Sequence, residues 1–144
     1  MAEAKHHEKV SVAMKSIFET IMNFESYPSF ASGVKAAKIT ERSENTLVVD
    51  MDLEMIKRVS YQIDVSWELS DDAARVWWTL KSGELFKRND GEWRLKVVDE
   101  NTTDVTYSLD VEFNFSVPGF ILKNLIKKSL PQAVHDFTNK AQNG

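Results

Sequence analysis

The sequence contains no cysteine and only three histidines among its 144 residues. Without cysteine there is no thiol nucleophile, no cysteine-ligated zinc or iron–sulfur site and no disulfide. His6 and His7 lie near the start of the chain, and His135 stands alone near the other end. A lone histidine without a second ligand or a nucleophile is more often a surface residue than a catalyst. The sequence therefore predicts no metal site and no cofactor.

Glycine and proline are almost as scarce, at five and three copies. The glycines are scattered, so the chain lacks the glycine-rich loop that holds nucleotide phosphates. The serine-centred nucleophile motif of hydrolases is also absent. No stretch rich in Gly, Ser or Pro divides the sequence, and no repeat is visible. We therefore expect residues 1–144 to form a single domain.

Long apolar runs and an excess of positive charge are missing as well. No stretch approaches the roughly 18 consecutive apolar residues of a membrane span. Residues 1–9 are charged and no apolar segment follows them, so we expect a cytoplasmic protein. The formal net charge is −4, whereas proteins that bind the phosphate backbone carry a basic surface. We expect no nucleic-acid partner.

The apolar residues that are present recur with two different periods. In residues 13–24 they recur at helical spacing, and the segment Tyr27-Pro28-Ser29-Phe30 predicts a second short helical turn. Between residues 34 and 115 they alternate with polar residues, which predicts about six antiparallel strands after a short first strand near residues 5–12. Turn-forming residues separate the strands; they lie at 70–72, 81–83, 89–91 and 99–101.

From Ser116 onward the spacing is helical again, and Pro118 suits the first turn of a helix. Pro131 lies inside this segment and predicts a kink or a break near Ser129, because proline removes a backbone hydrogen bond. The elements are thus a strand, two short helices, several strands and one long helix. This order predicts an α+β fold in which one helix covers the apolar face of a curved sheet and can enclose space.

The inward face of the predicted strands carries no carboxylate, lysine or histidine. Its residues are aliphatic or aromatic, and polar atoms occur only on tyrosine hydroxyls and indole N–H groups. General acid–base catalysis therefore has few candidates. Such a face is typical of an ordinary core and also of a cavity that holds an apolar ligand. The acidic residues of these strands fall on the alternate, solvated face; they are Asp50, Asp52, Glu54, Asp64 and Glu68.

The start of the terminal helix is basic. Residues 117–144 carry a net charge of +3, whereas residues 1–116 carry −7. Helical spacing places Phe120, Lys123 and Lys127 opposite the apolar stripe of the helix. Apolar and basic side chains in this arrangement resemble a membrane-surface contact, although lysines also form ordinary solvated helix faces. Peripheral contact with the inner face of the membrane is therefore one interpretation of this segment.

Four features of the sequence together resemble one protein superfamily. They are the order of elements, the segment from Phe18 to Tyr27-Pro28-Ser29-Phe30, the spacing from Leu85-Phe86 to Trp93, and the closing Val117-Pro118-Gly119-Phe120. In these features the chain is similar to the START-like, helix-grip superfamily. Within it, the chain resembles the polyketide cyclase/dehydrase and lipid-transport group that includes the coenzyme Q-binding proteins. The resemblance covers residues 6–141.

The resemblance implies a seven-stranded antiparallel sheet wrapped around the long C-terminal helix, with two short helices after the first strand. Between sheet and helix it implies a cavity for a lipid, isoprenoid quinone, sterol or polyketide-like molecule. By similarity, the expected ligand-binding residues are Phe30, Met51, Met55, Tyr61, Trp78, Trp93, Leu122, Ile126 and Phe137. Trp67 and Tyr107, which bring polar atoms to the inward face, join this set.

Three functional hypotheses are open on this basis. The first is a non-catalytic protein that binds or transports a hydrophobic small molecule. The second is a polyketide cyclase or aromatase in which Tyr61 or Tyr107 assists proton transfer. The third is a ribosome-associated interaction protein, although the acidic composition argues against direct RNA contact. We expect the first, because the inward face lacks the charged groups of a catalytic site.

Overall fold

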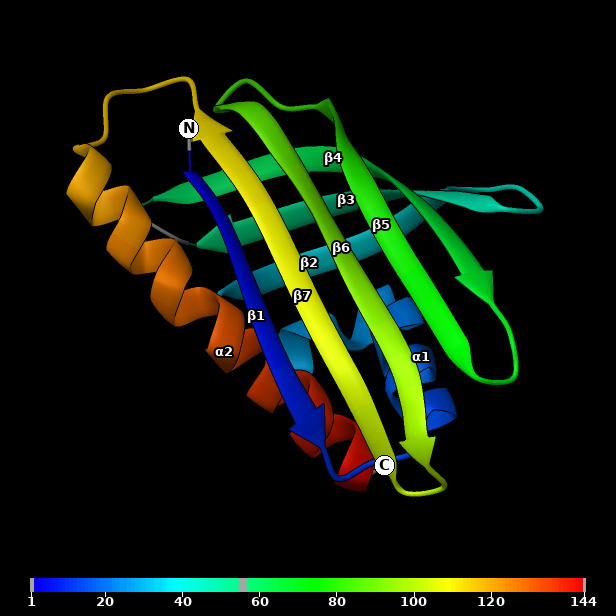
Figure 1. Cartoon of the computed structure of the whole chain (residues 1–144). Coiled ribbons are helices and arrows are strands. Elements are labelled where there is room, and N and C mark those ends of the chain that lie inside the picture. Colours follow the sequence, from blue (N-terminus) through cyan, green and yellow to red (C-terminus); the bar gives the residue numbers. More distant parts are fainter. Residues whose placement is uncertain (1, 55–56, 144) are drawn as a thin grey trace.

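The computed structural model describes residues 2–54 and 57–143. Within these residues the chain forms one seven-stranded antiparallel sheet, a long terminal helix and two short helices (Figure 1). The α+β helix-grip arrangement expected from the sequence is confirmed. The elements in chain order are β1 (Ala2–Val10), α1 (Met14–Met22), the 3₁₀ helix η1 (Phe24–Ser29), β2 (Val34–Arg42), β3 (Thr46–Glu54), β4 (Arg58–Leu69), β5 (Ala73–Ser82), β6 (Phe86–Asp99), β7 (Thr102–Phe113) and α2 (Gly119–Asn143).

The strand order across the sheet is β1-β7-β6-β5-β4-β3-β2. Strands β2 to β7 follow one another as a meander, while β1 pairs with the last strand, β7. The chain must therefore cross from one edge of the sheet to the other between β1 and β2. Helices α1 and η1 make this crossing, and they lie under the sheet in Figure 1.

The alternation of apolar residues places one face of each strand inside. In β4, for example, Val59, Tyr61, Ile63 and Val65 are all buried. Because successive side chains of a strand point to opposite faces, the residues between them lie on the outer face. The inner face of the sheet is therefore an apolar surface that α1, η1 and α2 have to cover.

Helix α2 covers only part of this surface. It packs against β1, β7 and α1, and its buried residues form one stripe, which consists of Leu122, Ile126, Leu130, Val134 and Phe137. In Figure 1, α2 runs beside β1, while β2, β3 and β4 pass behind the front strands at a steep angle. The sheet thus curves over α2, which packs chiefly against the β1–β7 side of the sheet.

Two local predictions are wrong. Residues 89–91 do not form a turn, because β6 runs through them from Phe86 to Asp99. Gly91 instead permits close packing: a Cβ at this position would lie 2.1 Å from Cζ2 of Trp78. The break, one of the two alternatives predicted near Ser129, is also absent, since α2 continues through Pro131. Leu130 and Val134, on either side of the proline, are fully buried and hold the helix in place.

Candidate functional site

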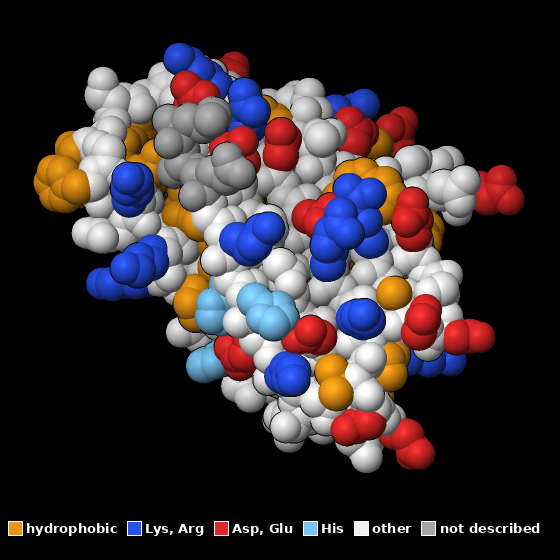
Figure 2. Space-filling view, in the orientation of Figure 1, with side chains coloured by type: hydrophobic (Ala, Val, Ile, Leu, Met, Phe, Trp, Pro, Cys, Tyr) orange, Lys and Arg blue, Asp and Glu red, His pale blue; other side chains and the backbone are white. Residues whose placement is uncertain are grey.

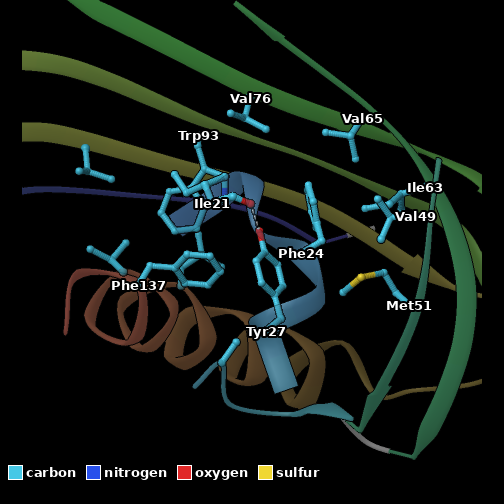
Figure 3. Packing of buried hydrophobic residues seen from close by; sticks show 14 of the residues in the cluster. Ile21, Phe24, Tyr27, Val49, Met51, Ile63, Val65, Val76, Trp93 and Phe137 are labelled. Carbon is cyan, nitrogen blue, oxygen red and sulfur yellow. Dashed lines mark hydrogen bonds between the residues drawn. The ribbon is translucent and has the colours of Figure 1, made fainter. Parts of the chain in front are cut away.

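A cavity of about 350 Å³ lies between the inner face of the sheet and α2. This volume is at the lower end of the range for small-molecule sites. Aromatic rings of η1, β6 and α2 form one wall, and Figure 3 shows Tyr27, Phe137 and Trp93 together there, with Met51 on the opposite side. The lining consists of Ile21, Phe24, Tyr27, Ala31, Ser32, Gly33, Val34, Met51, Leu53, Glu54, Tyr61, Ile63, Val76, Trp78, Asn89, Trp93, Tyr107, Leu109, Val111, Leu125, Ser129, Leu130, Gln132, Ala133, Asp136 and Phe137.

The structure brings six of the expected ligand-binding residues to this cavity. They are Met51, Tyr61, Trp78, Trp93, Tyr107 and Phe137. Five strands, β3 to β7, and α2 contribute them, so residues far apart in the sequence line one cavity. Met55, also expected here, lies outside the described residues.

Four expected residues do not line the cavity. Leu122 and Ile126 are buried but do not line the cavity. Of their stripe, Leu130 and Phe137 reach the cavity, and the neighbouring Leu125, Ser129 and Ala133 line it as well. Trp67 lies on β4 opposite Val76, closer to the end of the strand, and is half-buried in the core. Phe30 packs edge-on against the rings of Tyr27 and Phe137, at centroid distances of 5.7 and 5.0 Å, and so lies outside the cavity wall.

One polar region of the cavity lies on the strands β4 to β7. The Trp78 indole N–H donates to Oδ1 of Asn89 at 3.3 Å, and the side-chain amide of Asn89 also lies beside the Tyr61 hydroxyl. The ring of Tyr107 stacks on Trp93 at a centroid distance of 4.1 Å. Asn89 is only 4% exposed. We define Tyr61, Trp78, Asn89 and Tyr107 as the polar cluster.

Sequence reasoning missed Asn89 because Asn-Asp-Gly is a common turn signal. The period of two could have found it: Trp93, Gly91 and Asn89 are two residues apart, and all three lie on the inner face of β6. A glycine inside a strand often marks a close approach of another group. Here that group is the Trp78 ring, whose indole lies against Gly91 and reaches Asn89.

The three cavity tyrosines stay protonated at neutral pH. Burial raises the pKa of Tyr27, Tyr61 and Tyr107 above the ordinary value for a phenol. The Tyr27 hydroxyl donates to the carbonyl of Ile21 and so is used within the fold. Tyr61 and Tyr107 therefore offer neutral hydroxyl groups, which can donate hydrogen bonds but do not act as bases.

The mouth of the cavity lies between α2 and the segment that leads into β2. Asp136 joins the two sides: its Oδ2 accepts a hydrogen bond from the Ser32 backbone N–H at 2.9 Å, and its Oδ1 accepts one from Gln132 at 2.8 Å. Glu54 also lines the mouth, and Lys35 lies 3.6 Å from its carboxylate. Ser32, Gln132 and Glu54 are exposed. Both carboxylates were missed, because their sequence neighbours indicate only a solvated surface.

The basic start of α2 is fully accessible. Phe120 is 69% exposed and Ile121 is 42% exposed, and Lys123 and Lys127 are exposed beside them. Figure 2 shows apolar and basic side chains together at the left edge of the molecule, over the first turns of α2. None of the helices formed by the described residues is both long and apolar enough to cross a membrane.

The sequence matches the model of one protein family. That family is described as "Polyketide cyclase / dehydrase and lipid transport", and the match covers residues 10–138. The chain belongs to this family. No curated protein sequence matches the chain. The matched range includes every described lining residue of the cavity, so the cavity is part of the family domain.

Solved structures show the same fold at low sequence identity. A START superfamily protein from Mycobacterium smegmatis has a TM-score of 0.85 at 18% identity, with 98% of this chain and 97% of that chain covered. The Zhui aromatase/cyclase from Streptomyces sp. R1128 has a TM-score of 0.83 at 11% identity, with 98% and 93% covered. Human STARD10 has a TM-score of 0.86 at 12% identity, with 98% and 63% covered. The human StAR-related lipid transfer protein 5 shares the fold as well, with a TM-score of 0.85 at 8% identity and 98% and 76% covered. The fold therefore occurs in proteins named for lipid transfer and in one named as an aromatase/cyclase.

Proposed function

We propose that the chain is a single ligand-binding domain that carries a hydrophobic small molecule in its cavity without catalysing a reaction. The observation that supports this most directly is the space between α2 and the sheet. A core of this size normally packs without large voids, yet about 350 Å³ remains open here and is lined mainly by aliphatic and aromatic side chains. A lipid, isoprenoid quinone or polyketide-like molecule would fill such a space.

Apolar burial would drive the binding. Transfer of apolar surface out of water contributes roughly 25 cal/mol per Å², and the rings of Trp93, Phe137 and Tyr27 offer a preformed apolar wall. The thioether of Met51 adapts to ligands of different shape, because it is flexible and polarizable. Family membership supports the same reading, since the family includes lipid-transport proteins.

The test is native mass spectrometry, with organic extraction, of the protein purified from its own host. Ala133→Phe places a ring in the cavity, because Ala133 lines it from α2. Thr79→Phe is the matched control, since Thr79 is exposed on β5 and does not line the cavity. We expect a bound small molecule in the wild type and in Thr79→Phe, and at least about tenfold less in Ala133→Phe. Equal retention in all three proteins would contradict the proposal, as would a ligand-free wild type after incubation with quinones and phospholipids.

The start of α2 serves, in this proposal, as the contact with an anionic membrane surface. Two exposed apolar side chains, Phe120 and Ile121, stand next to Lys123 and Lys127. Apolar groups that enter the headgroup region and lysines that pair with anionic lipids act together in such contacts. Through this contact the carrier would receive or deliver its ligand.

Vesicle sedimentation tests the membrane contact. We expect the wild type to bind vesicles of phosphatidylglycerol and phosphatidylcholine at low salt, and to bind pure phosphatidylcholine vesicles much less. The variant with Phe120→Ser and Lys123→Gln should lose this binding, whereas Val98→Ser, which alters an exposed apolar residue on β6, should keep it. Equal binding to vesicles with and without phosphatidylglycerol would contradict the proposed contact of α2 with an anionic membrane.

A polyketide cyclase or aromatase is the second candidate. The observation that favours it is the Tyr107 hydroxyl, a proton donor on the wall of the cavity. Cyclisation of a linear poly-β-ketone in the presence of the protein, followed by liquid chromatography and mass spectrometry, separates the two functions. A ring pattern that the wild type directs and Tyr107→Phe does not would favour the enzyme. The same products with and without protein would eliminate it.

A further inference from the structure

One end of the cavity, on the strands β4 to β7, contains hydrogen-bonding groups whose partners are incomplete. Among residues 2–54 and 57–143, no group accepts a hydrogen bond from the Tyr107 hydroxyl. Burial is the one cause of the raised pKa of Tyr107, with no hydrogen bond contributing. Asn89 accepts from Trp78 with its carbonyl oxygen, and its amide nitrogen faces the Tyr61 hydroxyl. Tyr107 is half-buried and lines the cavity, and a donor on a cavity wall loses its hydrogen bond to water when a ligand displaces that water. A ligand with an acceptor group at this end would satisfy it.

No positively charged side chain of the described residues lines the cavity. The lining contributed by the described residues contains no Lys, Arg or His. An ionised carboxylate or phosphate buried here would lose its hydration without gaining an opposite charge, which is strongly unfavourable. The polar cluster consists of an amide, an indole and two phenols, which are neutral groups that suit a neutral partner.

The mouth adds a second barrier to anions. Asp136 and Glu54 both line it, and one cation close to them, Lys35, lies 3.6 Å from the Glu54 carboxylate. The Asp136 carboxylate is held by two neutral donors, the Ser32 backbone and the Gln132 side chain, so its negative charge is not cancelled. An anionic head group left at the mouth would therefore meet like charge.

From these observations we infer that the cavity selects neutral ligands with a carbonyl or hydroxyl group at one end, which the polar cluster binds, and discriminates against carboxylates and phosphates. Tyr107 donates to the ligand oxygen, and Asn89 positions the cluster through Trp78 and Tyr61. The inference rests on the proposed carrier function and adds the ligand class to it. Aryl ketones, phenols and quinones belong to this class, while fatty acids do not.

Three probes of the same shape test the selectivity by isothermal titration calorimetry near neutral pH. They are 2-acetylnaphthalene, a neutral ketone; 2-ethylnaphthalene, its hydrocarbon counterpart; and 2-naphthoate, its anionic counterpart. A net hydrogen bond corresponds to an affinity ratio of up to about tenfold. We expect the ketone to bind about tenfold more tightly than the hydrocarbon, and at least about 100-fold more tightly than the carboxylate, whose burial lacks a cation.

Two variants then locate the selectivity. Tyr107→Phe removes one oxygen and keeps the ring that stacks on Trp93, and Asn89→Leu replaces the amide by an apolar group of similar shape. In both, we expect the ketone to lose its advantage while 2-ethylnaphthalene binds within about threefold of its wild-type affinity. Asn139→Leu is the matched control, since Asn139 is exposed on α2 outside the cavity, and it should keep the wild-type preference.

The outcomes separate this inference from the function on which it rests. If the wild type binds the ketone and the hydrocarbon equally, or binds the carboxylate as tightly as the ketone, the selectivity is overturned while the carrier function stands. If Tyr107→Phe and Asn89→Leu both keep the full preference, the polar cluster is not its source. If none of the probes binds, the carrier function fails, and the inference fails with it. Near-UV circular dichroism of each variant confirms that its fold is retained.

Discussion

The two long sides of α2 differ in what they face. On one side, Ile126 and Val134 are fully buried where the helix packs against β1, β7 and α1. On the other side, Leu125, Ser129 and Ala133 line an open cavity. The two stripes are only one residue apart in the sequence, and they share the same backbone. The difference therefore lies in the size of the side chains and in what the curved sheet brings opposite them.

This comparison shows how one helix can both stabilise a fold and leave room for a ligand. Large branched side chains on the packed side fill the interface, whereas the small side chains Ser129 and Ala133 on the other side leave space. The Ser129 hydroxyl donates to the Leu125 carbonyl at 2.7 Å, so this polar group is satisfied within the helix and needs no partner in the cavity. The packed side of α2 stabilises the fold, and the open side lines the cavity.

The largest expected effect is on the packed side. Ile126→Ala should lower the free energy of unfolding by about 2–5 kcal/mol, because it creates a void in a filled interface. Leu125→Ala should cost about 1 kcal/mol, since Leu125 already borders open space. Urea unfolding of both variants measures the difference. Similar losses in the two variants would remove the distinction between the sides.

An intermediate effect is expected on the cavity wall opposite α2. Gly91→Ala places a Cβ against the Trp78 ring and forces it toward the cavity, which should cost about 1–3 kcal/mol and reduce ligand affinity. Gly119→Ala is the matched control: its Cβ would meet nothing within 4 Å, so we expect a change below about 1 kcal/mol. Urea unfolding and tryptophan fluorescence report on both. A Gly91→Ala protein as stable as the control would show that the wall is loosely packed.

The smallest effect concerns the buried tyrosines on the open side. Burial raises the pKa of Tyr107 above its usual value near 10, so above about pH 10 the unfolded chain loses this proton while the folded chain holds it. Stability is therefore fully present below about pH 10 and falls above it, by up to about 1.4 kcal/mol per pH unit for each such tyrosine. Tyr107→Phe should flatten the loss by that amount in urea unfolding at alkaline pH. An unchanged slope, or tyrosinate absorbance that develops fully near pH 10 in the native protein, would place this tyrosine in contact with bulk water.

Much of the fold follows from the periods in the sequence. The alternation through Tyr61, Ile63 and Val65 predicts β4 and its inner face, and the helical spacing after Pro118 predicts α2. These patterns are strong because each repeats over many residues. The pairing of β1 with β7 is different: it joins the first strand to the last, about 100 residues apart in the sequence, and no local period encodes it. The family resemblance, rather than the spacing, indicated the full sheet.

The cavity was only partly predictable. Met51, Trp78 and Tyr107 lie on strand faces that a period of two identifies, and they do line the space. On α2, the family resemblance rather than the spacing placed Ile126 in the cavity. Successive residues of a helix are rotated by about 100°, and the neighbouring Leu125 lines the cavity instead. The curvature of the sheet decides which side of the helix packs tightly and which side borders the cavity. The sequence pattern does not encode that curvature.

The sheet order has a consequence for the behaviour of the protein in concentrated solution. An outer strand exposes unpaired N–H and C=O groups, to which a strand of another molecule can add. On one side of the sheet, β1 lies next to α2. On the other, β2 carries charged side chains at Lys35, Lys38, Glu41 and Arg42, and its register shifts between Val34 and Ala36 and again between Ile39 and Glu41. Charge and bulges both discourage edge-to-edge pairing. The strand that borders the mouth of the cavity is thus built to resist aggregation while the sheet stays open.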